Sequence, residues 1–117
     1  MSEVERVNVE KRLSDMAIYN GVAYLAGQVP ADGSLDIQGQ TAQVLATIDR
    51  LLAMAGTDKS RILMAQIFLT SMKEFDGMNK AWDAWVAHGN APPRATVEAR
   101  LANPDFKVEI VVTAALA

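Results

Sequence analysis

Residues that share one helical face recur from Ile37 onward and predict a first helix. These residues are Ile37, Thr41, Val44, Leu45, Ile48, Leu51, Leu52 and Ala55. Asp36 is a residue type that caps helix starts, and Gly56 suits the position just past a helix end. The pattern therefore predicts a helix that begins at Ile37 and ends at about Ala55.

A second helix is predicted after Ser71. Ser71 and Glu74 have the spacing of a capping box. The apolar stripe that follows consists of Phe75, Met78, Trp82, Trp85 and Val86. His88 is expected in the last helical turn, followed by Gly89, and the pair Pro92-Pro93 rules out continuation of the helix.

Six other stretches are predicted as strands, namely residues 4–9, 15–19, 22–26, 62–69, 95–99 and 108–115. Asn20-Gly21 between the second and third stretches favours a tight hairpin turn. A second turn is expected at residues 30–34, and a loop at residues 103–105. The order β-β-β-α-β-α-β-β indicates an α+β fold, with about six strands in one sheet and two helices on one face.

Two predicted strands are apolar on both faces, which indicates oligomerisation. Residues 61–69 and 108–115 lack the alternation of polar and apolar residues that a sheet with one face in water requires. Two helices can cover one face only, and the chain has no further element for the other. Other subunits are therefore expected to cover it.

Composition and charge exclude several classes of protein. The length of 117 residues suits a single domain, residues 1–117. The absence of cysteine excludes disulfides and thiolate metal sites, and the single histidine leaves no multi-histidine metal site within one chain. The net charge of −3 and the lack of a long Lys/Arg run argue against nucleic-acid binding. No signal-peptide or membrane-spanning pattern is visible, so a cytoplasmic protein without a membrane partner is expected.

Arg94 and Glu109 are the residues that most clearly break their surroundings. Arg94 follows two prolines and opens a strand of small and apolar residues, and Glu109 interrupts the apolar last strand. One interpretation is that they form structural ion pairs, with each other or with other charges. The other is that Arg94 binds a carboxylate through its fork of N–H groups while Glu109 activates water. Both interpretations are open at this point.

Other candidates are weaker. Gly27-Gln28 ends a strand, where glycine either lets a ligand approach the backbone or makes a bend. His88 is expected to interact with a helix end, Trp82 to pack in the core, and Asn79 to be solvated or locally bonded. A serine nucleophile at Ser14 would have only His88 as its base, so a serine hydrolase is disfavoured.

Four segments, in order, resemble the RidA (YjgF) family. They are Tyr24-Leu-Ala-Gly-Gln-Val-Pro30, Asn79-Lys-Ala-Trp-Asp-Ala-Trp85, Ala91-Pro-Pro-Arg-Ala-Thr-Val-Glu98 and Phe106-Lys-Val-Glu-Ile110. The resemblance covers nearly the whole chain and is closest to the YoaB-like branch. Archetypal members differ in having a tyrosine near the position of Leu13 or Ser14, and a cysteine where this chain has Thr96.

The resemblance implies a chorismate-mutase-like fold and a homotrimer with a central barrel and three intersubunit clefts. It implies hydrolysis of 2-imino or enamine acids, such as 2-aminoacrylate and 2-iminopropionate, to 2-oxo acids and ammonia, without a cofactor. Arg94 matches the arginine that clamps the substrate carboxylate, and Glu109 the acid that positions water. Gly27, with Gln28 beside it, matches the backbone that lines the cleft. The alternatives are a non-catalytic binder or sensor of small carboxylates and a role with a protein or RNA partner.

The apolar pattern generates a first testable expectation. Because one sheet face lacks a cover within the chain, the protein should sediment as an oligomer at micromolar concentration, with the mass of a trimer if the resemblance holds. Analytical ultracentrifugation measures this directly. A monomer at that concentration would contradict the pattern argument.

Overall fold

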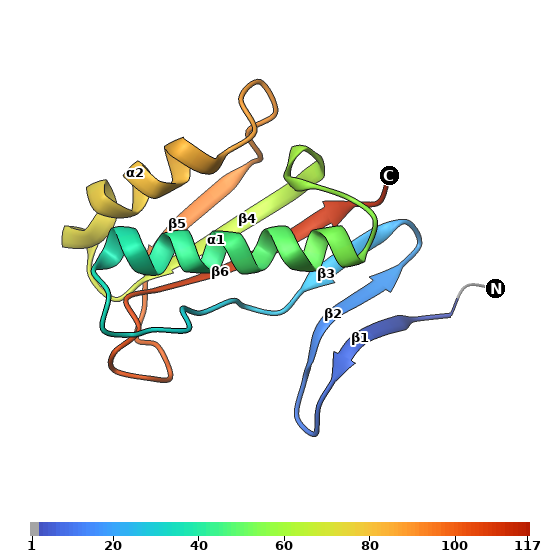
Figure 1. The fold of residues 1–117 in the computed structure, drawn as a ribbon, viewed down its shortest axis with the longest axis horizontal. Coiled ribbons are helices and arrows are strands. Elements are labelled where there is room, and N and C mark those ends of the chain that lie inside the picture. Colours follow the sequence, from blue (N-terminus) through green and yellow to red (C-terminus); the bar gives the residue numbers. More distant parts are fainter. Residues whose placement is uncertain (1–2) are drawn as a thin grey trace.

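A computed structural model describes residues 3–117 and contains one six-stranded sheet in the order β1-β2-β3-β6-β4-β5 (Figure 1). Strands β4 and β5 are parallel, and all other neighbours are antiparallel. The strands are β1 (Glu5–Val9), β2 (Ser14–Tyr19), β3 (Val22–Leu25), β4 (Ile62–Leu69), β5 (Arg94–Glu98) and β6 (Val108–Ala115). The six strands predicted from the sequence are confirmed, with ends that shift by one residue at most.

Two helices, α1 (Ile37–Met54) and α2 (Phe75–Trp85), lie on the same face of the sheet (Figure 1). The fully buried residues Val44, Ile48 and Leu52 of α1 belong to the same core as Ile110 of β6 and Ile67 of β4. The predicted α+β arrangement with both helices on one face is confirmed. None of the helices within residues 3–117 is long and apolar enough to cross a membrane.

Local sequence signals explain how these elements begin and end. Asn20 and Gly21 have φ angles of 50° and 77°, which a tight hairpin turn between β2 and β3 requires. The Asp36 carboxylate accepts a hydrogen bond from the Gly39 N–H at 2.8 Å and caps α1. Gly56, with φ of 76°, follows the helix as predicted.

The second helix is shorter than the sequence predicts. Val86 has extended backbone angles, φ −55° and ψ 143°, so α2 ends at Trp85 and the placement of His88 in its last turn was wrong. The chain instead turns at residues 87–90, where the Asn90 N–H bonds to the Ala87 carbonyl and Gly89 has a φ of 84°. This turn redirects the chain toward β5, which a continued helix would not reach.

The capping prediction for Ser71 also needs correction. The Ser71 hydroxyl accepts a hydrogen bond from the Lys73 N–H and caps a short 3₁₀ helix, η2 (Met72–Glu74). Glu74 directly precedes α2, and its side chain makes no capping hydrogen bond to the helix. A serine with a glutamate three residues later signals a helical start, but this spacing does not distinguish a single 3₁₀ turn from the α-helix that follows it.

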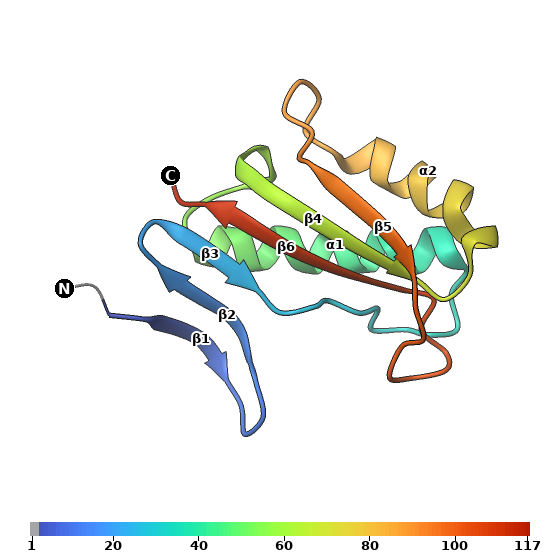
Figure 2. The same ribbon diagram turned by 180° about the vertical axis from the view of Figure 1, so that it is seen from behind.

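No helix formed by residues 3–117 lies on the opposite face of the sheet (Figure 2). Tyr24, Thr113 and Met64 are neighbours across three strands on this face, and Tyr24 and Met64 are 49% and 43% exposed. Val97 pairs with Phe68 on the same face and is 45% exposed. Large apolar side chains on an uncovered sheet face are typical of a surface that meets another protein chain.

A buried glutamine joins the two loops at one end of the sheet. Gln40 of α1 is fully buried, and its Nε2 lies 3.0 Å from the Asp105 carbonyl and 3.1 Å from those of Gly33 and Leu35. Its Oε1 accepts a hydrogen bond from the Lys107 N–H at 2.8 Å. One neutral side chain therefore satisfies backbone groups of two loops that have no regular secondary structure of their own.

Removal of this amide should destabilise the protein. Gln40→Leu keeps the volume but leaves several buried backbone groups without partners, so the free energy of unfolding should fall by about 2–4 kcal/mol. Urea denaturation at fixed protein concentration measures the loss. Gln38→Leu, an exposed position on the same helix, is the control and should change stability by less than about 0.5 kcal/mol. Equal small effects in both variants would contradict the assigned role.

Candidate functional site

Arg94 is the first residue of β5 and points toward the helices. It pairs with the buried Ala65 of β4, so its side chain lies on the helix-covered face. Its Nη1 donates a hydrogen bond of 2.7 Å to Oδ1 of Asn79 on α2. Its Cζ lies 5.2 Å from the ring centroid of Trp82 and 6.0 Å from that of Phe75. The guanidinium is therefore held by one neutral amide and lies beside two aromatic rings.

These surroundings leave the charge of Arg94 available. A structural ion pair would place a carboxylate on the guanidinium, whereas the amide of Asn79 orients it without neutralising it. Aromatic faces near the cation stabilise its charge by cation–π attraction. The bond to Asn79 uses Nη1, so the edge formed by Nε and Nη2 is the one suited to a planar anion.

Glu109 lies on the other face of the sheet. It is the second residue of β6 and pairs with Phe68 of β4, whereas Arg94 pairs with Ala65 of the same strand. Side chains along a strand alternate between faces, so the odd separation of Ala65 and Phe68 places Arg94 and Glu109 on opposite sides. One chain does not bring the two residues together, and they form no ion pair with each other within it.

Gly27 and Gln28 lie beside Glu109. The backbone of Gln28 exchanges two hydrogen bonds with Ile110, of 2.9 and 3.0 Å, which extends the ladder between β3 and β6 by one bridge. A Cβ atom added to Gly27 would overlap Oε2 of Glu109. The Gln28 side chain donates to the Ala26 carbonyl at 2.9 Å. A side chain at position 27 would therefore force the Glu109 carboxylate to leave the place it occupies beside the glycine.

The structure thus groups the predicted site residues into two half-sites. Glu109, Gly27 and Gln28 lie together near the uncovered face of the sheet, and Arg94 lies alone on the helix side. Sequence reasoning missed that Asn79, Trp82 and Phe75 surround Arg94. A signal was present, since Phe75, Asn79 and Trp82 are spaced as one helical stripe and asparagine is the only polar member.

Leu13 and Thr96 stand near the positions where archetypal RidA proteins have a tyrosine and a cysteine. Leu13 is 52% exposed in the connection before β2. Thr96 follows Arg94 by two residues on the same face of β5, and its hydroxyl oxygen is buried without a hydrogen-bond partner within residues 3–117.

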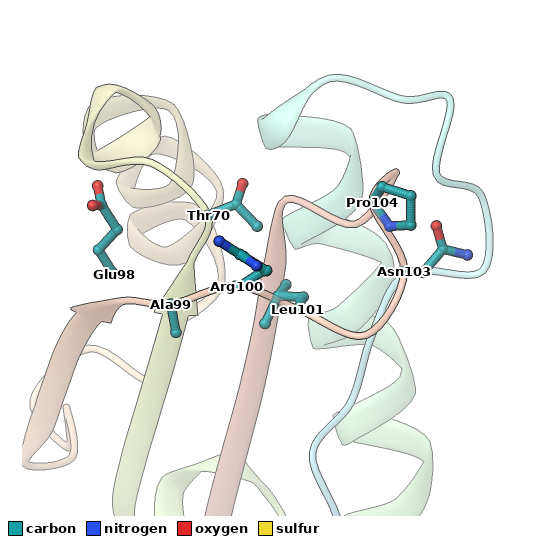
Figure 3. Close-up of a pocket in the computed structure, with 7 residues that line it drawn as sticks. All are labelled: Thr70, Glu98, Ala99, Arg100, Leu101, Asn103 and Pro104. Carbon is teal, nitrogen blue, oxygen red and sulfur yellow. The ribbon is translucent and has the colours of Figure 1, made fainter.

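A separate cavity of about 510 Å³ lies beyond the ends of β4 and β5 (Figure 3). Its lining includes Thr70, Glu98, Arg100 and Asn103. The Glu98 carboxylate accepts a hydrogen bond from the Met72 N–H at 2.9 Å, which ties β5 to the turn before α2. Neither Arg94 nor Glu109 lines this cavity, so it is distinct from both half-sites.

Comparison with known proteins identifies the class to which this arrangement belongs. Residues 4–116 match the model of the family described as endoribonuclease L-PSP. The chain belongs to this family, also called the RidA/YjgF family, and within it to the YoaB-like branch.

Particular relatives support this placement. The chain is 60% identical to a RutC family protein of Haemophilus ducreyi, over 97% of both chains. It is 49% identical to the RutC family protein YoaB of Escherichia coli K12, over 97% of this chain and 98% of the other. A YjgF-family crystal structure from Neisseria meningitidis has a TM-score of 0.96 at 45% identity, covering 98% of this chain and 96% of that one. The fold predicted from the resemblance is confirmed.

The contact between Gly27 and Glu109 can be tested by a double-mutant cycle. Gly27→Ala should displace the Glu109 carboxylate into another rotamer and lower the free energy of unfolding by about 1 kcal/mol. The same substitution in a Glu109→Ala background should cost less than about 0.5 kcal/mol, because the obstructing carboxylate is absent. Urea denaturation of the four proteins gives the coupling. An equal cost in both backgrounds would show that the two residues do not compete for space.

Proposed function

We propose that this protein hydrolyses reactive 2-imino and enamine acids to 2-oxo acids and ammonia, at clefts between the subunits of a homotrimer. The observation that carries the proposal is an arginine oriented by a neutral amide, together with a carboxylate packed on a glycine, in the family's matching motifs. The rest of the proposal is a single domain over residues 1–117, a cytoplasmic location, and no resident cofactor, nucleic-acid partner or membrane partner.

The need for more than one subunit follows from the opposite orientations of Arg94 and Glu109. Arg94 lies on the helix-covered side of β5, which is an edge strand of the sheet. A cleft that contains both residues therefore requires this edge of one chain to meet the uncovered sheet face of another. The exposed apolar residues on that face, Tyr24, Met64 and Val97, support burial against a neighbouring copy. In a ring of three identical subunits, the same contact made three times gives three equivalent clefts.

The proposed mechanism divides the work between the two half-sites. Arg94 binds the substrate carboxylate through two parallel hydrogen bonds and so fixes the position of the neighbouring imine carbon. Glu109 accepts a proton from a water molecule as its oxygen attacks that carbon. Glu109 returns this proton to the nitrogen, which gives a carbinolamine. The carbinolamine hydroxyl then loses its proton to the nitrogen through Glu109, the C=O bond forms, and the C–N bond breaks to release ammonia. One imine and one water thus yield one 2-oxo acid and one ammonia.

Gly27 keeps Glu109 in place for this step. The absence of a side chain at position 27 allows the carboxylate to pack against the backbone rather than swing across the face of the sheet. Gln40 holds the segment at Lys107, two residues before Glu109, and the loop that follows Gly27 and Gln28. The acid is therefore positioned from both sides by elements of its own chain.

An alternative within the same site is a trimer that binds 2-oxo acids through Arg94 and turns nothing over. It would act as a sensor of small carboxylates. The family description refers to ribonuclease activity, but a net charge of −3 without a run of basic residues favours a small acid over RNA for this chain. Filter binding of RNA at low salt should accordingly show no salt-sensitive affinity.

A coupled assay tests the deaminase function. An amino-acid oxidase generates 2-iminopropionate, and semicarbazide traps the imine that survives. The wild-type protein should reduce the trapped imine, and Arg94→Ala should lower kcat/KM by about 100-fold because charge-assisted hydrogen bonds to the carboxylate are lost. Glu109→Gln should lower turnover more than it weakens 2-oxo acid binding, which calorimetry measures. Arg100→Ala, at an exposed arginine on the separate cavity, is the matched control.

Mixed trimers test whether the cleft is shared. Co-expression of Arg94→Ala and Glu109→Ala chains should restore about one quarter of wild-type activity, because random assembly rebuilds that share of intact clefts from two inactive chains. Activity no higher than in the separate variants would contradict a cleft between subunits. Saturable binding of 2-oxo acids without any loss of imine in the wild type would instead select the sensor.

A further inference from the structure

We infer that Asn79 is a positioning residue, which sets the orientation of Arg94 and thereby the angle at which the substrate is presented. This inference rests on the proposed function, because it concerns how the same arginine receives a carboxylate. Its basis is the 2.7 Å hydrogen bond from Nη1 of Arg94 to Oδ1 of Asn79.

The geometry limits how the guanidinium turns. The planar group rotates about its Cζ–Nε bond and about the side-chain torsions, and one short hydrogen bond at Nη1 restricts both. The Trp82 side chain is 5% exposed, and its ring centroid lies 5.2 Å from Cζ of Arg94. The buried ring limits movement of the guanidinium on that side. The amide and the ring project from positions 79 and 82 of one helix, so α2 holds the guanidinium from one side. The edge formed by Nε and Nη2 is then the one presented to the carboxylate.

The chemical identity of Asn79 matters as much as its position. An aspartate there would keep the acceptor oxygen and would form a charge-assisted pair with Arg94. It would therefore compete with a substrate carboxylate for the same cation. An alanine would leave the cation unneutralised but free to turn. Asparagine is the residue type that accepts the bond and leaves the positive charge uncompensated.

The two substitutions should consequently have different kinetic signatures. Asn79→Asp should weaken binding, with KM and the 2-oxo acid Kd raised by about tenfold or more while kcat falls less. Asn79→Ala should lower kcat by about tenfold, because a misoriented carboxylate displaces the imine carbon from the attacking water, while Kd changes less. A residue that served only the stability of α2 would produce neither split.

A spectroscopic measurement separates this inference from the deaminase function. In protein labelled with ¹⁵N-arginine, the Arg94 Nη resonances of the wild type should be resolved, because rotation about Cζ–Nε is slow while Nη1 is held. In Asn79→Ala they should average. Arg94→Lys identifies the resonances, and Asn90→Ala, at an exposed asparagine in the turn after α2, is the matched control that should leave them unchanged.

The outcomes are distinguishable. If the wild type neither hydrolyses imines nor binds 2-oxo acids while the Arg94 resonances still average in Asn79→Ala, the proposed function fails and the positioning of Arg94 stands. If Arg94→Ala is inactive but Asn79→Ala matches Asn90→Ala in spectrum, kcat and KM, the inference about Asn79 is overturned. Equal effects of Asn79→Asp and Asn79→Ala on KM would also overturn it, since charge would then play no part.

Discussion

Two helices cover only one face of a six-stranded sheet, and this constraint determines where every candidate functional group lies. Residues that alternate along β4, β5 and β6 face either the helical layer or the open side. Arg94 faces the helical layer, where α2 supplies an amide and aromatic rings to hold it. Glu109 faces the open side next to Phe68, where its carboxylate lies against Gly27. The separation of the two charges is thus a result of strand periodicity rather than of loop geometry.

Two neutral amides, of Gln40 and Asn79, hold parts of the molecule that bear on the candidate site. The fully buried Gln40 joins two loops by hydrogen bonds to their backbone groups. Asn79 orients the guanidinium of Arg94 at the edge of the sheet. Both satisfy hydrogen-bonding groups without introducing a buried charge, which would carry a large desolvation penalty. Within residues 3–117, the guanidinium of Arg94 is hydrogen-bonded to the neutral amide of Asn79, and the Glu109 carboxylate lies against Gly27. An arrangement of this kind suits the binding of a charged small molecule better than it suits stability.

Much of the fold was predictable because its signals are local. The Asn20-Gly21 turn, the Asp36 cap and the helical stripe from Ile37 to Leu52 each act over a few residues, and each is found as predicted. The end of α2 was not predictable in this way, because Val86 leaves the helix to meet a turn and a strand that local propensity does not describe. For the site, Arg94 and Glu109 stood out as charges on apolar strands. Their opposite orientation depends on the register with β4. Spacing along the chain places Asn79 on one stripe of α2 with Phe75 and Trp82, but the approach of that stripe to Arg94 depends on how α2 packs beside β5.

The contact between Gly27 and Glu109 has an evolutionary consequence. A side chain gained at position 27 would overlap the carboxylate oxygen, so a lineage can accept it without strain only after the acid has shortened or moved. The two positions should therefore covary among relatives: glycine is retained wherever the glutamate is, and larger residues arise where the glutamate has been lost. The pairing offers a way to divide the family's sequences into those that keep this half of the site and those that have released both residues for other uses.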